Sequence, residues 1–204
     1  DKIENIFRFS DQIPIDTLSN RTEYKNSSLS FTGKFKHNIS EHFRVNSSLN
    51  FSKNFLKINN TEEDYFFLNP TIRFNIRKTK FGNIAATYSY QNNIPKSRYL
   101  TKNYILKNYR TFTRGTDQIE KTNNHSFSLF YSYSFFKEQF LINSYLLHSF
   151  SNKSYGLNSL ITEQTNFSHY QMVGGGRLTT YNLSLSKYLK FISSSIKFQT
   201  LQDW

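Results

Sequence analysis

The sequence has no cysteine, one methionine and one tryptophan among its 204 residues, and only three prolines and seven glycines. The lack of cysteine excludes disulfides, thiolate metal ligands and cysteine nucleophiles. The low proline and glycine content excludes collagen-like chains and argues against linker-type disorder. The segment richest in aromatic residues, His125–Phe150, is neither long enough nor apolar enough to form a membrane helix.

Aromatic residues and positive charge are what the sequence has in excess. It contains 21 phenylalanines and 14 tyrosines, and its formal net charge at pH 7 is +12. The mean hydropathy is nonetheless −0.62, so the chain is hydrophilic on average. Bulky apolar residues are too frequent for a disordered chain. A basic balance of this size is typical of chains that meet nucleic acid, an anionic membrane surface or acidic ligands.

The aromatic-rich segment shows how these residues are arranged. From residue 126 to residue 135, large residues and serines alternate, with Phe130 as the exception. Successive side chains of a β-strand point to opposite faces, so the alternation predicts a strand with one apolar and one polar face. A helix would scatter the same residues around its circumference. The large residues are Phe127, Leu129, Tyr131, Tyr133 and Phe135, and the serines are Ser126, Ser128, Ser132 and Ser134.

The same alternation recurs along the chain, at 29–35, 43–55, 68–76, 84–90 and 181–185. Phe140–Phe150 is ambiguous, because both of its faces carry apolar residues. We expect about ten strands, the first near Ile3–Phe9 and the last near Phe191–Leu201. Strands of soluble domains average roughly five or six residues. Several of the runs here last about ten, and a tilted transmembrane barrel strand needs about 9–11. Strand length therefore favours a membrane barrel.

The predicted connections take turns in length. Short ones are expected near 36–42, 77–82, 136–139 and 186–190, and long polar ones at Lys53–Asp64, Gln91–Asn124 and Ser151–Gln164. Outer-membrane barrels have short periplasmic turns at one rim and long extracellular loops at the other. A β-sandwich also alternates apolar and polar residues, but its loops need not sort by length. We therefore predict an all-β fold, an antiparallel transmembrane β-barrel of the outer membrane.

Two segments resemble a known family. Tyr65–Pro95 is similar to a hairpin in the barrels of TonB-dependent receptors and their relatives in Bacteroidetes. Leu100–Tyr133 resembles the loop and strand that follow that hairpin. The shared features are Asn-Pro at a strand start, Ile-Pro at the start of the loop and a Tyr-Arg…Arg-Gly element before the next strand. The resemblance covers about a third of the chain.

The resemblance implies a barrel of about 22 strands. It also implies a plug in the lumen and energy supplied by an inner-membrane complex. Neither a plug nor a coupling motif is visible in the sequence. The chain begins at Asp1 and ends at Trp204, with Gln202 and Thr200 interrupting the apolar alternation that usually precedes a terminal aromatic residue. We expect residues 1–204 to be a single barrel domain or, more specifically, a fragment of a larger barrel.

Several residue patterns have simple structural explanations. His37 and His42 flank a predicted turn, which favours solvated rim residues over metal ligands. Val173–Leu178 contains three glycines but lacks the Gly-Lys-Ser/Thr ending of a phosphate loop, so we predict a bulge, a bend or a close backbone approach. Glu62–Asp64 lacks the spaced oxygen ligands of a calcium loop and is expected in a solvated loop. No G-x-S-x-G elbow occurs. We predict no catalytic, cofactor or metal residues.

The longest predicted connection carries the candidate ligand contacts. It holds seven basic residues against Asp117 and Glu120, a net charge of +5, interleaved with aromatic residues. As an extracellular loop it can contact lipopolysaccharide phosphates or capture an anionic ligand. Docking of a surface lipoprotein, or a merely solvated loop, stays open. The basic residues are Lys96, Arg98, Lys102, Lys107, Arg110, Arg114 and Lys121; the candidate ligand contacts are Arg98, Tyr104, Tyr109, Arg110 and Arg114.

Three classes of function compete. A receptor barrel would take up a bulky nutrient, in contact with outer-membrane lipid, a plug and, if the receptor is complete, the inner-membrane complex. A structural barrel would anchor an assembly without transport. A nucleic-acid binder that stacks bases on aromatic side chains would account for the charge, but not for the long strands or the sorted loops. The sequence favours the receptor barrel and predicts no nucleic-acid partner and no enzymatic activity.

Overall fold

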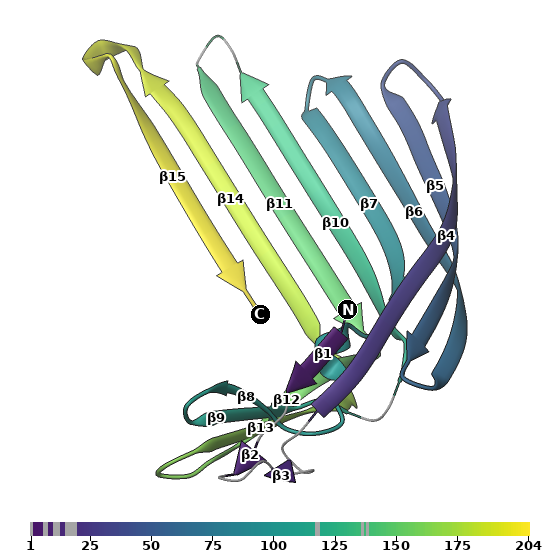
Figure 1. Ribbon diagram of the computed structural model, residues 1–204. Helices are drawn as coiled ribbons and strands as arrows, with labels where there is room; N and C mark the ends of the chain where they lie inside the picture. Colours follow the sequence, from purple (N-terminus) through teal and green to yellow (C-terminus); the bar gives the residue numbers. More distant parts are fainter. Residues whose placement is uncertain are drawn as a thin grey trace.

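The computed structural model describes residues 2–5, 8–9, 13–14, 20–116, 119–135, 137 and 139–204, with the side chains of these residues from 22 onward except 78 and 79. A curved sheet of nine antiparallel strands dominates it (Figure 1). In spatial order the strands are β1 (Lys2–Asn5), β4 (Asn20–Asn38), β5 (Phe43–Ile58), β6 (Thr61–Thr79), β7 (Gly82–Asn93), β10 (Thr122–Phe135), β11 (Phe140–Ser151), β14 (Arg177–Leu189) and β15 (Ser194–Asp203). We call this sheet the wall.

Two smaller sheets complete the described chain. The first has the order β12 (Lys153–Ile161), β13 (Asn166–Gly174), β9 (Thr111–Arg114) and β8 (Ile105–Asn108), and we call it the small sheet. The second pairs β2 (Arg8–Phe9) with β3 (Ile13–Pro14). Two short 3-10 turns, η1 (Ser97–Tyr99) and η3 (Lys190–Ile192), lie in connections.

The predicted all-β antiparallel fold is confirmed, with nine described strands in the wall against about ten expected. The ambiguous segment Phe140–Phe150 forms β11. The predicted first strand, Ile3–Phe9, overlaps β1 and β2, and its residues 6 and 7 lie outside the described residues. Among the described strands, β1 and β15 are the two edges of the wall and do not pair with each other.

None of the helices in the described part of the chain is both long and apolar enough to cross a membrane.

One face of the wall is apolar across its strands. Directly opposed residues of neighbouring strands share a face, so the pairing of Phe31 with Phe51, and of Phe51 with Leu68, continues the face from β4 to β6. Ile72 opposes Tyr88, which opposes Phe127, and this carries the same face through β7 to β10. Many of these side chains are exposed, Phe31 at 72% and Leu68 at 43%. A soluble sheet would cover such a face.

The apolar belt has the height of a membrane. On β6 every position of this face from Phe66 to Ile76 is apolar, and the belt ends at Asp64 and Glu62. At a rise of about 3.3 Å per residue this stretch is ~33 Å long. A strand tilt of about 40° reduces it to ~25 Å, the height of the apolar band on outer-membrane barrels.

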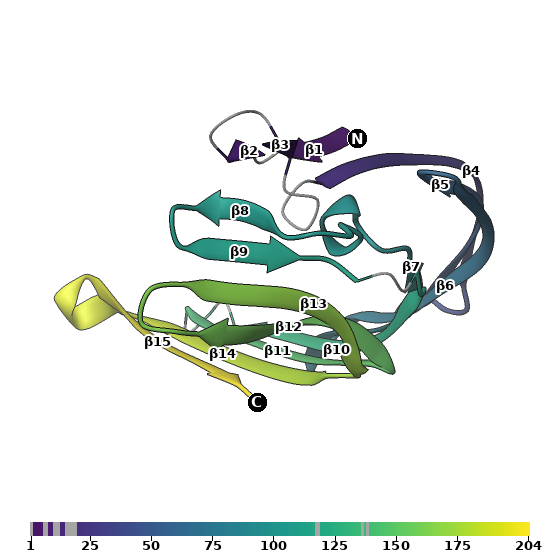
Figure 2. The same cartoon turned by 60° about the horizontal axis from the view of Figure 1, so that its bottom comes forward.

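The opposite face of the wall is polar. It is the concave face, because the small sheet lies against it in the hollow of the wall (Figure 2). Thr32, Asn50 and Asn69 oppose one another across β4, β5 and β6, and the Asn50 amide donates to the Thr32 hydroxyl at 2.7 Å. The predicted separation into one apolar and one polar face is confirmed. Phe130, the exception in its strand, lies on the concave face opposite Ala85 and Tyr145.

The connections sort by length as predicted, with one exception. Short links join β4 to β5, β6 to β7, β10 to β11 and β14 to β15, all at one end of the wall (Figure 1). We call this the turn end and the opposite one the loop end. In the link near 136–139, residues 136 and 138 lie outside the described residues. The predicted long connection Gln91–Asn124 leaves the loop end between β7 and β10. The predicted loop Ser151–Gln164 leaves the same end but has the wrong bounds, because the connection continues to Gly176 and contains β12 (Lys153–Ile161) and β13 (Asn166–Gly174).

The predicted loop Lys53–Asp64 is wrong. Strands β5 and β6 continue through it and turn at Asn59, whose φ is +51°. The charged residues that suggest a loop face one another across this hairpin, where Lys53 pairs with Asp64 at 3.1 Å and Lys57 pairs with Glu62. The acidic cluster Glu62–Asp64 is thus part of a strand and not of a solvated loop, because opposite charges on facing strands stabilise the pairing.

The glycine run Val173–Leu178 makes a close backbone approach, as predicted. A Cβ on Gly175 would lie 1.4 Å from the carbonyl oxygen of Ser151. The Ser151 amide donates to the Gly176 carbonyl at 3.0 Å. The glycines therefore let the chain return from the small sheet to the wall beside the point where it left.

Candidate functional site

The two long connections fold together into one unit. β8 and β9 come from the first connection, and β12 and β13 from the second and the chain that follows it. β9 runs parallel to β13, with Thr111 opposite Asn166 and Arg114 opposite His169. Figure 2 shows this small sheet inside the curve of the wall, between β4–β5 on one side and β10–β15 on the other. It lies across the loop end of the concave face.

A small apolar core anchors the first connection to the wall. Leu56 and Ile58 of β5 are 2% and 8% exposed, and Leu100 of the connection, 6% exposed, packs against them. Half-buried residues surround this core, and among them the Tyr24 hydroxyl donates to the Pro95 carbonyl at 3.0 Å. These surrounding residues are Tyr24, Tyr65, Tyr99 and Ile119. The connection is therefore held on the concave face by apolar contacts and by hydrogen bonds to its backbone.

A glycine closes the first connection on itself. The Gly115 amide donates to the Thr101 carbonyl at 2.9 Å and lies 2.8 Å from its hydroxyl oxygen, and the Thr116 amide donates to the Tyr99 carbonyl at 2.7 Å. A Cβ on Gly115 would come within 2.3 Å of the Thr101 nitrogen. The Arg-Gly element of the family resemblance thus has a structural role, because only glycine fits this contact.

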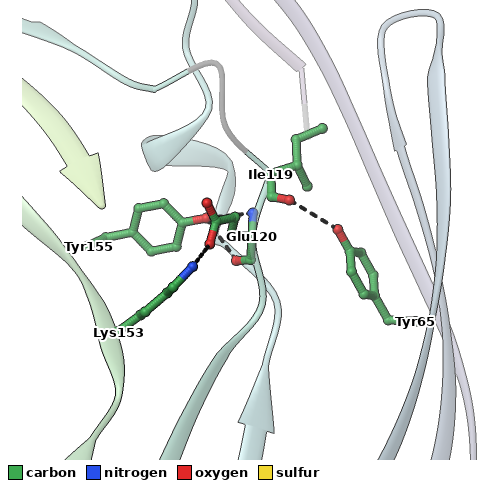
Figure 3. Close-up of polar contacts among 5 residues, drawn as sticks. All are labelled: Tyr65, Ile119, Glu120, Lys153 and Tyr155. Atoms are coloured by element: carbon green, nitrogen blue, oxygen red, sulfur yellow. Dashed lines mark hydrogen bonds and ion pairs between the residues drawn. The ribbon is translucent and has the colours of Figure 1, made fainter. Parts of the chain in front are cut away.

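Glu120 joins the second connection to the first (Figure 3). The Tyr155 hydroxyl donates to the Glu120 carbonyl at 2.9 Å and accepts from the Glu120 amide at 3.1 Å. Lys153 pairs with the Glu120 carboxylate at 2.5 Å. On the other side, the Tyr65 hydroxyl of the wall donates to the carbonyl of the adjacent Ile119 at 3.4 Å. Burial raises the pKa of Tyr155, although the hydrogen bond with the Glu120 backbone partly lowers it, so the hydroxyl stays protonated at neutral pH.

Tyr99 is the centre of an aromatic cluster between wall and small sheet. It stacks on Tyr155 at 4.8 Å and 8°, and meets the edge of Tyr170 at 4.8 Å and 71°. The Arg98 guanidinium lies 4.8 Å from the centre of the Tyr99 ring. Aromatic pairs of this geometry contribute beyond their buried area.

A polar cavity of about 600 Å³ lies between this cluster and the wall. Amides from β4 to β7 line one side and the two connections line the other. Amides and two lysines next to aromatic rings can hold a polar solute by hydrogen bonds and ring contacts. Residues from both sides include Asn54, Asn69, Asn92, Lys96, Tyr99 and Tyr155.

The structure divides the five predicted ligand contacts among three places. Arg98 stacks on Tyr99, as described above. Tyr109, 81% exposed, and Arg110 form the turn between β8 and β9, with the guanidinium 5.0 Å from the ring centre. Tyr104 and Arg114 line a second cavity, of about 630 Å³, together with His169 and neighbours on β13. Asp117, part of the predicted charge balance, lies outside the described residues.

Several residues of the site carry no signal in the sequence. Tyr155 and Lys153 belong to the second connection, whose composition is unremarkable. The wall amides face the connections only because the strands curve around them. The sequence does show that the chain is rich in tyrosine and asparagine. It does not show which of these residues come together at the site.

The histidines lie in two settings. His37 stacks near Phe35 beside the turn between β4 and β5, and His42 ends that turn, as predicted. His125 stacks on Phe150 at 4.6 Å and 6°, and its Nδ1 lies 2.9 Å from the Tyr88 hydroxyl. In the described part of the chain there is no group of three or more acidic or histidine side chains that could hold a metal ion.

No known family model and no curated protein matches the chain. Among solved structures, the chain is similar to the FrpB iron transporter from Neisseria meningitidis (F3-3 variant), with a TM-score of 0.51 and 11% sequence identity. The alignment covers 90% of this chain and 26% of that one, so the chain spans about a quarter of the length of the transporter it matches. The long antiparallel strands of the wall therefore match part of the fold of that transporter.

Proposed function

We propose that this chain is part of the wall of an outer-membrane receptor barrel that takes up a bulky nutrient. The observation that carries the proposal is the pairing of two faces: an apolar belt ~25 Å high outside, and a polar concave face beneath the small sheet. The fold of the transporter described above supports it. The proposal includes no catalytic role. It does include a source in Bacteroidetes, which the resemblance of Tyr65–Pro95 implies.

The proposal sets the orientation of the chain in the membrane. Short turns of outer-membrane barrels lie in the periplasm and long loops outside the cell. The turn end is then periplasmic, and the small sheet lies over the extracellular mouth. In this position a ligand arriving from outside the cell contacts the five candidate residues, Arg98 to Arg114, before it enters the lumen. Outer-membrane lipid, lipopolysaccharide, further barrel strands, a plug, an inner-membrane energising complex and a surface lipoprotein are the partners that the proposal includes.

Single-cysteine labelling tests the orientation, because the chain has no cysteine of its own. With a membrane-impermeant maleimide on intact cells, Tyr109→Cys at the tip of the small sheet should be labelled. Lys80→Cys, in the turn between β6 and β7, should be labelled only after the outer membrane is opened. Labelling of both positions, or of neither, on intact cells would contradict the proposed orientation.

A structural barrel without transport is the second candidate. The observation that favours it is that the small sheet lies across the loop end of the concave face, where a solute would enter (Figure 2). This candidate predicts a partner that co-purifies and no change in any solute's uptake when the protein is deleted. A receptor predicts loss of growth on at least one large nutrient that cannot pass through general pores.

A further inference from the structure

Basic residues gather on the concave face near the turn end. Lys36 of β4 and Arg73 of β6 oppose the two sides of Asn46 of β5, and Arg44 lies two residues before Asn46 on the same face. Lys34 lies on this face two residues before Lys36. Strands are ~4.8 Å apart, so Lys36 and Arg73 are separated by roughly 10 Å at their backbones. We call these four residues, Lys34, Lys36, Arg44 and Arg73, the concave basic patch.

The patch has no acidic counterpart in the described part of the chain. None of its four residues takes part in a described ion pair. On this face of β4 to β7 the acidic residue is Glu63, which lies at the loop end and bonds the Tyr65 hydroxyl. Glu41, in the turn between β4 and β5, makes no described ion pair with the patch. Four like charges in one area without compensation repel each other, so an anion between them is favoured.

The wall orients the two arginines of the patch. Arg44 Nε donates to Asn38 Oδ1 at 2.6 Å, and Arg73 Nε donates to Asn75 Oδ1 at 3.1 Å. Each arginine thereby uses its Nε on the wall, and its terminal nitrogens make no described hydrogen bond. Such a fork is suited to bidentate contact with carboxylate or phosphate.

A buried donor completes the area. Asn75, 2% exposed, opposes Arg44 in the register, and its Nδ2 has no acceptor among the described residues. A buried donor without an acceptor is costly and rare in native proteins. The described side chains of the patch and Asn75 are therefore cations and hydrogen-bond donors. A negatively charged acceptor would complement them.

We propose that the concave basic patch binds an anionic solute with two or more carboxylate or phosphate groups on its way through the barrel. The inference rests on the proposed function and names the class of its substrate. Rings of Lys and Arg select anions and phosphates in pores. The first long connection at the mouth is also basic, with seven positive residues against Asp117 and Glu120 in the sequence, so the two ends of the path attract the same sign of charge.

Calorimetric titration of the detergent-purified protein with tripolyphosphate tests the inference. The triple variant K36Q/R44Q/R73Q should bind the probe about tenfold more weakly or worse, because each lost charge removes a charge-assisted contact. The matched control K80Q/K187Q/K190Q removes the same number of charges at the turn end, but outside the concave face. Lys80 and Lys190 lie in turns, and Lys187 lies on the outward face opposite Phe140. Its affinity should change by no more than about twofold.

Three results would overturn the inference. The protein does not bind tripolyphosphate, or both triple variants weaken binding equally. Alternatively, K36Q/R44Q/R73Q lowers the melting temperature and leaves the affinity for tripolyphosphate unchanged. The patch would then stabilise the folded protein and not bind a solute. The cysteine labelling described above separates this failure from that of the proposed function. If the labelling is as expected but no anion binds, only the anion-binding inference is contradicted. If the labelling is not as expected, the proposed receptor function is contradicted.

Discussion

The hydroxyl of Tyr155 exchanges two hydrogen bonds with the backbone of Glu120, donating to its carbonyl at 2.9 Å and accepting from its amide at 3.1 Å. The two residues come from different long connections, so this contact joins the end of the first connection to β12 of the small sheet. It also places the Glu120 carboxylate beside Lys153 (Figure 3).

Replacing Tyr155 by phenylalanine should loosen the two connections from each other. The ring stack on Tyr99 is retained, but both hydrogen bonds are lost, at a cost of about 1–3 kcal/mol because the Glu120 backbone is left unpaired. Limited proteolysis should cut the connections faster in this variant while the wall strands stay resistant. Equal cleavage rates in variant and parent would contradict the role given to this contact.

The same contact should weaken in alkali. Because burial raises the pKa of Tyr155, its folded-state pKa lies above the unfolded value of about 10. The contribution to stability is complete below about pH 10 and is lost as pH rises from there through the folded pKa. Proteolysis of the connections should accelerate over this range in the parent protein. Tyr155→Phe, which has no hydroxyl to titrate, is the control and should show a smaller increase.

Gly115→Ala should destabilise the first connection. The new Cβ would come within 2.3 Å of the Thr101 nitrogen, and backbone on both sides must move. We expect a loss of about 1–3 kcal/mol in thermal or urea unfolding, as for overpacked sites. Gly33→Ala is the matched control, because a Cβ there meets no atom within 4 Å. Similar losses in the two variants would show that the contact with Thr101 is not the cause.

Arginine substitutions at two neighbouring positions of β6 should have different effects on stability, because the two side chains lie on opposite faces of the wall. Ile72→Arg puts a charge into the apolar belt and should cost about 2–4 kcal/mol of folding free energy in lipid vesicles. Thr71→Arg puts the same charge on the concave face and should be tolerated. Urea titration of vesicle-inserted protein measures both. If Thr71→Arg is the more damaging change, the assignment of the faces is reversed.

Sequence reasoning succeeded where the pattern is local. The period of two along β6 assigns Leu68 and Ile72 to one face and Asn69 to the other, and the register confirms it. It failed at Lys53–Asp64, because polar and charged residues in a row predict a loop as readily as a strand. Their partners are on the facing strand, and pairing of that kind is visible only once the register is known.

The candidate site was predictable only in part. The first long connection was identified by its length and charge, and the close backbone approach at the glycine run by the glycines themselves. The division of the five candidate contacts among three places was not predictable, since it depends on the β8–β9 hairpin, which turns at Tyr109 and Arg110 between Arg98 and Arg114. The same holds for Lys36, Arg44 and Arg73, which no local pattern unites.

By itself the sequence determined most strands of the wall, their two faces and the short connections, because the alternation of side chains is a local property of extended backbone. The tertiary structure alone decided that the two long connections form one sheet on the concave face. That arrangement depends on the pairing of Thr111 with Asn166 and of Leu56 with Leu100. These contacts join distant segments, and the curvature of the wall brings the segments together.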